Sequence, residues 1–117
     1  MVYNTIMKIL LTTLNAKYIH SSLALRDLQA YCREDYPNII IREYSINDPL
    51  EQVITSLVEQ QPDVLCFSCY IWNIRHTLDV MDTIKKVLPK CIFVLGGPEV
   101  SYNSEEMMEE NPLIDFI

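Results

Sequence analysis

The sequence predicts an open α/β sandwich, in which a parallel sheet carries helices on both faces. Short apolar, β-prone runs alternate with amphipathic stretches of helical period along the chain, as in proteins built from strand–helix–strand units. The links between these segments are short, which favours right-handed crossovers between parallel strands. With 117 residues, the chain suits one domain with one core, so we treat residues 1–117 as a single domain.

The first strand and the first helix are predicted over residues 6–14 and 20–35. The first range is apolar without helical spacing, whereas in the second the apolar side chains recur every three or four residues. Ser21 or Ser22 can accept a hydrogen bond from the free amides of the first turn. The apolar stripe of this helix consists of Leu25, Leu28, Tyr31 and Cys32.

The second strand and the second helix are predicted over residues 38–46 and 47–61. Consecutive isoleucines in the strand indicate burial on both of its faces. Asp48 is expected to cap the helix, with Pro49 at the first helical position and Glu51 completing a capping box. The inner stripe then consists of Leu50, Val53, Ile54, Leu57 and Val58.

The rest of the chain continues the alternation. We expect a strand, a helix and a strand, then a short acidic helix or turn and the start of a fifth strand, over residues 62–70, 73–88, 90–97, 103–111 and 113–117. This order predicts a three-layer sandwich of the flavodoxin-like or Rossmann-like type, with strand order 2-1-3-4-5. Because a fifth helix should cover the fifth strand, we expect residues 1–117 to be an amino-terminal part of a longer protein.

Charge and cysteine usage narrow the class of protein. The formal net charge is −7 and the nine basic residues are scattered, which argues against a nucleic-acid partner. No apolar run reaches the roughly 18 residues of a membrane span. The four cysteines are accompanied by no clear secretory signal, so we expect free thiols in the cytoplasm.

The only two glycines of the chain, Gly96 and Gly97, stand together after the fourth predicted strand and before Pro98. In open parallel sheets the ligand crevice lies outside the carboxyl ends of the strands. Glycine lets the backbone approach a ligand closely and permits positive φ. The pair therefore indicates either close approach to a ligand or a tight turn into the proline.

Familiar catalytic and nucleotide-binding motifs are missing from the loops at this edge. The loop after the first strand has no glycine, which argues against a dinucleotide or flavin phosphate site. Cys66 and Cys69 form a C-x-x-C spacing inside a predicted strand, where residues three apart point to opposite faces. We therefore predict no shared metal there, and a structural role for Cys66. No histidine–aspartate pair accompanies Ser68, so no catalytic residue is predicted.

The loops at this edge of the predicted sheet resemble those of a known family. The segments "LGGPEVS" after the fourth strand, "FSCYIWN" after the third and "LNAKYIHSSLALRDLQAY" after the first are similar to the amino-terminal cobalamin-binding domain of radical S-adenosylmethionine (SAM) enzymes. The class includes relatives of the anaerobic magnesium-protoporphyrin ester cyclase, and the resemblance covers nearly the whole chain. It implies the same α/β fold and a role as a cobalamin-binding module.

The resemblance also implies which residues contact the cofactor. The wider family uses a D-x-H-x-x-G loop with a histidine on cobalt, a serine after the third strand and a glycine pair after the fourth. Here Asn15, Lys17 and His20 occupy the three signature positions of the first loop, so a lysine replaces the histidine. Cobalamin is then expected without a protein histidine on cobalt, and the implied contact residues are Asn15, Lys17, Tyr18, His20, Ser68, Cys69, Tyr70, Gly96, Gly97, Pro98 and Glu99.

The resemblance places any catalysis outside this segment. The sequence contains no C-x-x-x-C-x-x-C cluster motif. A SAM site, a 4Fe-4S cluster and the radical SAM barrel would therefore follow Ile117, with the barrel as the intramolecular partner. The alternative is a docking domain that has lost cobalamin, which the missing histidine and the bulky Tyr18, Tyr70, Trp72 and Tyr102 would suit. An unrelated small hydrolase lacks a placed nucleophile and base.

Overall fold

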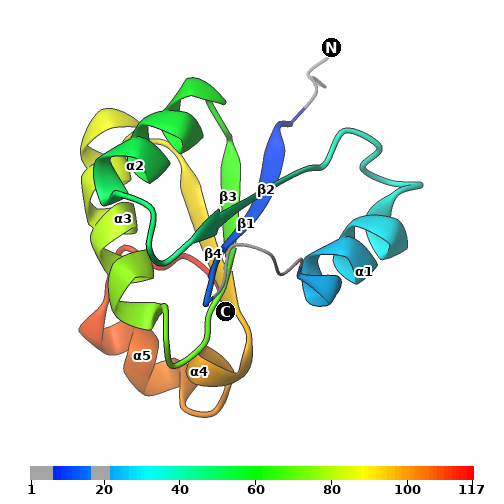
Figure 1. Cartoon of the computed structure of the whole chain (residues 1–117). Helices are drawn as coiled ribbons and strands as arrows, with labels where there is room; N and C mark the ends of the chain where they lie inside the picture. Colours follow the sequence, from blue (N-terminus) through cyan, green and yellow to red (C-terminus); the bar gives the residue numbers. More distant parts are fainter. Residues whose placement is uncertain (1–6, 17–21) are drawn as a thin grey trace.

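The structure, a computed structural model, describes residues 7–16 and 22–117 and contains a four-stranded parallel sheet (Figure 1). The strands are β1 (Ile9–Asn15), β2 (Ile40–Ser45), β3 (Val64–Ser68) and β4 (Ile92–Gly96). Their order is β2-β1-β3-β4, and every neighbouring pair is parallel. The predicted order of the first four strands is confirmed.

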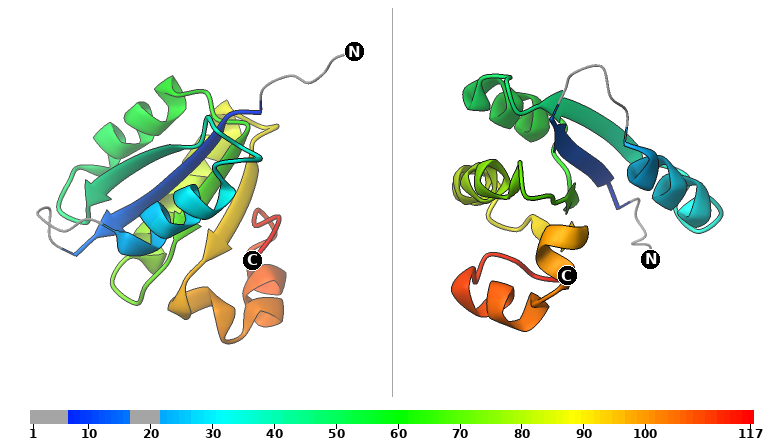
Figure 2. Two further views of the ribbon diagram at one scale, coloured as in Figure 1. Left: turned by 90° about the vertical axis from the view of Figure 1, so that its right-hand side faces the viewer. Right: turned by 60° about the horizontal axis from the view of Figure 1, so that its bottom comes forward.

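The helices form the outer layers of the sandwich. They are α1 (Leu23–Cys32), α2 (Leu50–Glu59), α3 (Ile74–Val87), α4 (Pro98–Ser101) and α5 (Ser104–Glu110). Figures 1 and 2 show α1 on one face of the sheet and α2 and α3 on the other. The expected three-layer architecture is therefore present.

The predicted fifth strand is reduced to one bridge. Phe116 pairs in parallel with Val94 of β4, and its carbonyl accepts a hydrogen bond from the Leu95 N–H at 3.0 Å. The Asp115 carboxylate accepts another from the Phe93 N–H at 2.8 Å. The chain thus arrives beside β4, where the fifth strand of the predicted order belongs.

The two faces of the sheet carry cores of unequal size. The larger cluster lies under α2 and α3 and is centred on Leu10, Leu65, Phe67 and Phe93. The smaller one lies under α1 and contains Leu11, Leu25 and Ile39 as its buried members. Alternate residues of each strand feed the two clusters, as the pleat of a buried parallel sheet requires.

On its α1 face, the sheet is covered over β1 and β2 but not over β4. Figure 2 shows α1 lying over the β1 and β2 side of the sheet, whereas β4 lies outside the area that the helix covers. Ile92 and Phe116 are 36% and 60% exposed, and Val94 is only partly buried. Within the described residues, this half of the sheet therefore offers an apolar surface that no helix covers.

Two details of the predicted helices are wrong. Leu28 and Tyr31 point to solvent, because α1 packs on a narrow strip and buries mainly Leu25 and Cys32. The carboxylate of Asp48 does not cap α2: it accepts a hydrogen bond from the Ser45 N–H at 2.8 Å, and Pro49 takes the cap position. The predicted cap of α1 is confirmed, since the Ser22 hydroxyl accepts from the Leu25 N–H.

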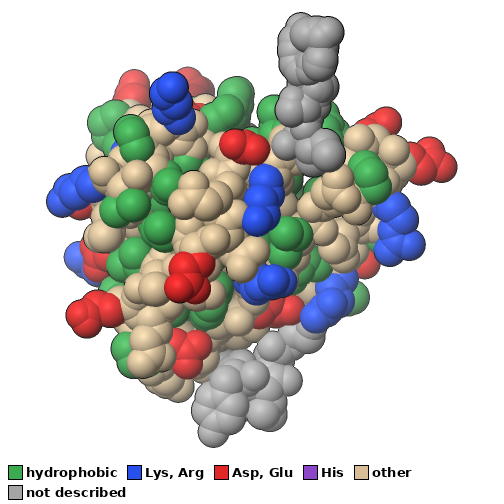
Figure 3. Space-filling model, turned by 90° about the horizontal axis from the view of Figure 1, so that it is seen from above, with side chains coloured by type: hydrophobic (Ala, Val, Ile, Leu, Met, Phe, Trp, Pro, Cys, Tyr) green, Lys and Arg blue, Asp and Glu red, His purple; other side chains and the backbone are tan. Residues whose placement is uncertain are grey.

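The surface opposite the predicted crevice carries mixed charge. Seen from the amino ends of the strands, Lys and Arg side chains are interspersed with Asp and Glu (Figure 3). Across residues 7–16 and 22–117, none of the helices has both the length and the apolar character needed to cross a bilayer.

Thr12 of β1 is fully buried under α2 and α3, and its hydroxyl has no hydrogen-bond partner among the described residues. Because an unpaired buried hydroxyl is unfavourable, we expect Thr12→Val to stabilise the fold by about 1 kcal/mol. The free energy of unfolding from urea titration measures this. The neighbouring Thr13→Val should instead destabilise, because the Thr13 hydroxyl donates to the Ser68 carbonyl at 2.8 Å. Equal effects of the two substitutions would contradict this reading.

Candidate functional site

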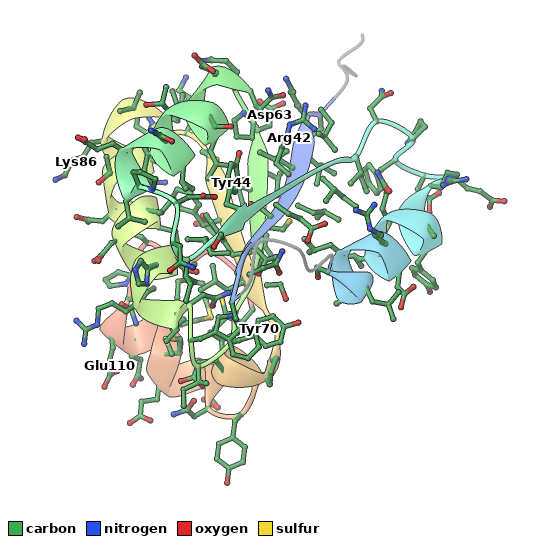
Figure 4. All side chains as sticks on the ribbon, in the orientation of Figure 1. Arg42, Tyr44, Asp63, Tyr70, Lys86 and Glu110 are labelled. Atoms are coloured by element: carbon green, nitrogen blue, oxygen red, sulfur yellow. The ribbon has the colours of Figure 1, made fainter. Side chains whose placement is uncertain are left out.

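The loops after β3 and β4 hold each other at the carboxyl edge of the sheet. The Cys69 N–H donates to the Gly96 carbonyl at 2.7 Å, and the Glu99 N–H donates to the Cys69 carbonyl at 3.3 Å. In Figure 4, the labelled Tyr70 marks this edge and Asp63 the opposite one. Two of the loops that the sequence singles out are therefore in direct contact.

Gly97 is required by this contact. Its backbone has φ 100° and ψ 171°, a conformation that is essentially restricted to glycine. A Cβ on Gly97 would stand 2.5 Å from the Cys69 carbonyl oxygen and 2.9 Å from its nitrogen. Of the two interpretations open for the glycine pair, turn geometry therefore accounts for Gly97. Pro98 follows it as the first residue of α4, where a proline loses no hydrogen bond.

Gly96 is different, because it faces open space. Apart from Gly96 and its two chain neighbours, no atom of the described residues lies within 4 Å of the place where its Cβ would stand. Gly96 pairs in register with Ser68 of β3, so both positions project from the α1 face of the sheet. The space beside Gly96 thus continues the uncovered apolar surface over β3 and β4.

The Ser68 side chain lies at the rim of this space. The residue is 7% exposed, and its carbonyl accepts hydrogen bonds from Thr13 and Asn73. Its hydroxyl makes no hydrogen bond to the described part of the chain. A nearly buried hydroxyl beside a side-chain-free position can donate to a polar group of a bound molecule.

The two cysteines of the C-x-x-C spacing lie in opposite cores, as predicted. Cys66 packs against the α1 cluster, whereas Cys69 is buried in the larger one. Burial raises the pKa of the Cys69 thiol to about 12, and the nearby Glu99 carboxylate acts in the same direction. Burial also raises the pKa of Cys66 to about 11. Both thiols therefore stay protonated at neutral pH and act as packing groups.

An aromatic pair stands at the same edge. The rings of Tyr70 and Trp72 are stacked, with 4.5 Å between centroids and an interplanar angle of 2°. Trp72 is 43% exposed and Ile71, between the two, is 78% exposed. The pair is therefore a flat apolar surface that remains open to a ligand or a neighbouring domain.

Glu43, which the sequence did not single out, connects both ends of the first loop. One carboxylate oxygen accepts from the Asn15 side-chain amide at 2.9 Å and from the Ser22 N–H at 2.6 Å. The other oxygen pairs with Arg26 of α1 at 3.2 Å. Asn15, a predicted contact residue, is thereby held at the loop's entrance. Lys17, Tyr18 and His20 lie outside the described residues.

Asn73 is the second residue that the sequence did not single out. It was expected simply to begin the third helix, yet it is fully buried and its side-chain amide donates back to the ends of β1 and β3. Its position before a helical stretch is the only signal in the sequence, and that signal suggests an ordinary cap.

The edge offers binding surfaces rather than catalytic groups. The described residues contain no group of three or more His, Cys, Asp or Glu side chains placed to hold a metal ion. What they provide is an open position and a hydroxyl at the adjacent ends of β4 and β3, and a stacked aromatic surface in the loop after β3. These features suit a ligand that has both a slender part and a flat part.

Comparison with protein families gives one match over almost the whole chain. The model described as "B12 binding domain" matches residues 9–117. Among solved structures, a cobalamin-binding protein from Desulfitobacterium hafniense superposes with a TM-score of 0.68 at 14% identity, covering 94% of this chain and 51% of that one. At this identity the superposition bears on the fold alone.

Two curated relatives are similar over part of the chain. A cobalamin-dependent radical SAM methyltransferase, TokK, from Streptomyces tokunonensis is 35% identical over 69 residues, 59% of this chain. A 2-(S-pantetheinyl)-carbapenam-3-carboxylate methyltransferase from Streptantibioticus cattleyicolor is 36% identical over 56 residues, 48% of this chain. The matched segments span only 10% and 8% of those two proteins.

The contrast between the two glycines can be measured directly. We expect Gly97→Ala to destabilise the fold by about 2–3 kcal/mol or more, because it forces a side chain into a glycine-only conformation and against the Cys69 backbone. Gly96→Ala meets no atom, so it should change stability by at most about 1 kcal/mol, in the stabilising direction. Urea titration of both variants provides the comparison, and a greater loss for Gly96→Ala would refute it.

Proposed function

The chain belongs to the B12-binding domain family, and we propose that it holds cobalamin at the carboxyl edge of its sheet without a histidine of its own on cobalt. The observation that carries this proposal is the open position at Gly96 beside the Ser68 hydroxyl. The alternative is a decayed site whose crevice is closed by the neighbouring barrel. The open position supports a ligand instead, because no described atom other than those of Gly96 and its chain neighbours comes within 4 Å of it.

The nucleotide tail of cobalamin is the slender part of the ligand. We assign it to the α1 face, where Gly96 leaves room for it and the Ser68 hydroxyl can hydrogen-bond to it. The partly buried Cys66 and Val94 on the same face would pack against its apolar ring. Burial of this uncovered surface would contribute to affinity by removing apolar area from water.

The corrin ring is the flat part, and we assign it to the outside of the edge, against Tyr70 and Trp72. In the sequence, Lys17 occupies the position at which the wider family has its cobalt-binding histidine. His76, the only histidine among the described residues, belongs to α3, where its Nδ1 is buried. Bound cobalamin would supply a cobalt centre for alkyl chemistry, while this chain's residues bind and orient the cofactor.

The whole protein is proposed to be larger than this domain. The curated relatives are described as methyltransferases, one of them as a radical SAM enzyme, and the segments matched here span about a tenth of their length. By that analogy, we infer that residues 1–117 form a cofactor module preceding a radical SAM barrel. That barrel would carry the SAM and 4Fe-4S sites and would be the module's intramolecular partner.

A docking role without cobalamin is the second candidate. Ile71 and Tyr102 are 78% and 94% exposed in the loops after β3 and β4, as residues that contact another domain would be in the isolated module. This role needs no open position at Gly96, so the two candidates differ in what they expect of cobalamin.

Hydroxocobalamin binding tests the proposal. We expect the purified chain to retain cobalamin through gel filtration, with a visible spectrum showing the tail base released and no new nitrogen ligand on cobalt. Gly96→Leu should abolish retention because it fills the tail position, and Ser68→Ala should weaken affinity about fivefold, the loss of one hydrogen bond of about 1 kcal/mol. Isothermal titration calorimetry measures both.

The control variant introduces a leucine side chain away from the proposed tail position. Thr55 is exposed on α2, on the opposite side of the sheet, and Thr55→Leu should leave cobalamin affinity unchanged. If neither this chain nor the full-length protein retains cobalamin, the docking role replaces the proposal. Undiminished binding by Gly96→Leu would remove the tail assignment.

A further inference from the structure

Asn73 occupies the point where the sheet reverses its strand order. β1 lies between β2 and β3, so successive strands leave β1 in opposite directions and a crevice opens between the ends of β1 and β3. Asn73 is fully buried there, beneath the loop that carries the aromatic pair.

The side-chain amide of Asn73 joins the ends of the two strands. Its Nδ2 donates to the Leu14 carbonyl of β1 at 3.0 Å, to the Ser68 carbonyl of β3 at 3.2 Å and to the Thr13 hydroxyl at 3.2 Å. Strand ends that separate leave carbonyls without partners in the sheet, and such buried groups require a donor. Asparagine supplies it without introducing a charge.

The oxygen of the same side-chain amide holds the loop that carries Tyr70 and Trp72. Asn73 Oδ1 accepts from the Tyr70 N–H at 2.8 Å, and the Asn73 N–H donates to the Tyr70 carbonyl at 3.1 Å. Tyr70 to Asn73 therefore form a turn closed from both sides, with Ile71 and Trp72 at its exposed centre. The stacked Tyr70 and Trp72 rings stand on this turn.

We propose that Asn73 is a positioning residue, which fixes the stacked Tyr70–Trp72 pair over the crevice between β1 and β3 and thereby sets cobalamin affinity. The effect on affinity rests on the function proposed above. The effect on the aromatic pair does not, because it concerns the chain alone. Asn73 itself is buried beneath the surface that receives the ligand.

The position of the Tyr70–Trp72 pair can be followed by tryptophan fluorescence, because Trp72 is the only tryptophan of the chain. Asn73→Asp keeps the shape and the acceptor for the Tyr70 N–H but replaces the donor with an oxygen facing the Leu14 and Ser68 carbonyls. In cobalamin-free protein below its melting temperature, we expect Trp72 emission to shift to longer wavelength and its near-ultraviolet circular dichroism to fall. Cobalamin affinity should fall about tenfold or more, the equivalent of about 1.4 kcal/mol.

Two matched controls separate positioning from general destabilisation. Asn111→Asp makes the same chemical change at the end of α5, where the amide donates to the Met107 carbonyl, and should leave the emission unchanged. Thr13→Val removes one member of the network and should shift the emission in the same direction as Asn73→Asp, whereas Thr12→Val should not. If Asn73→Asp does not fold, the comparison of Thr13→Val with Thr12→Val tests the proposal instead.

The outcomes are distinct. A folded Asn73→Asp with wild-type emission and circular dichroism overturns the proposal, as does a Thr13→Val spectrum identical to that of Thr12→Val. Shifted spectra together with unchanged cobalamin affinity overturn the link to binding. If the wild-type chain binds no cobalamin but the spectra shift as expected, the function proposed above fails while the positioning of the aromatic pair stands.

Discussion

The carboxyl edge of this domain depends on one close backbone approach, that of Gly97 to Cys69. The two loops come so near each other that a single added carbon atom on Gly97 would overlap the Cys69 carbonyl. This approach aligns the Cys69 N–H with the Gly96 carbonyl and the Glu99 N–H with the Cys69 carbonyl. The tie between the loops keeps Gly96 beside Ser68 at the last register pair of β3 and β4. Adjacent glycines therefore have separate roles, one in shaping the edge and one in leaving it open.

Much of the fold could be predicted from periodicity. Apolar runs such as residues 62–70 and stripes such as that of α3 fix the type of each element, and the alternation of elements fixes parallel pairing and strand order. The predictions for single side chains were wrong where contacts between elements, and not the local pattern, decide a residue's surroundings. Tyr31 has helical spacing but no sheet beneath it, and Asp48 is used by the Ser45 turn instead of the helix. The amphipathic pattern does not tell how wide the covered strip of a sheet is.

The candidate site was predicted in outline only. The glycine pair and the resemblance pointed to the carboxyl edge of the sheet, and the structure brings Ser68, Cys69, Gly96, Gly97 and Glu99 together there. The residues that connect the loops could not be found in this way. Glu43 lies 21 residues from Ser22, whose N–H it accepts, and Asn73 lies about 60 residues from Thr13 and Leu14. Such long-range hydrogen bonds have no local signature, since asparagine before a helix suggests a cap.

The half-covered sheet has a consequence for how the proposed cofactor module matures. A molecule that occupies the bare surface beside β3 and β4 completes the hydrophobic core, so the loaded and empty forms differ in thermodynamic stability as well as in occupancy. Ligand uptake then favours the compact state by mass action, and an empty chain unfolds more readily and becomes a substrate for proteases. For the proposed cobalamin module, cofactor supply would in this way affect the abundance of the folded protein.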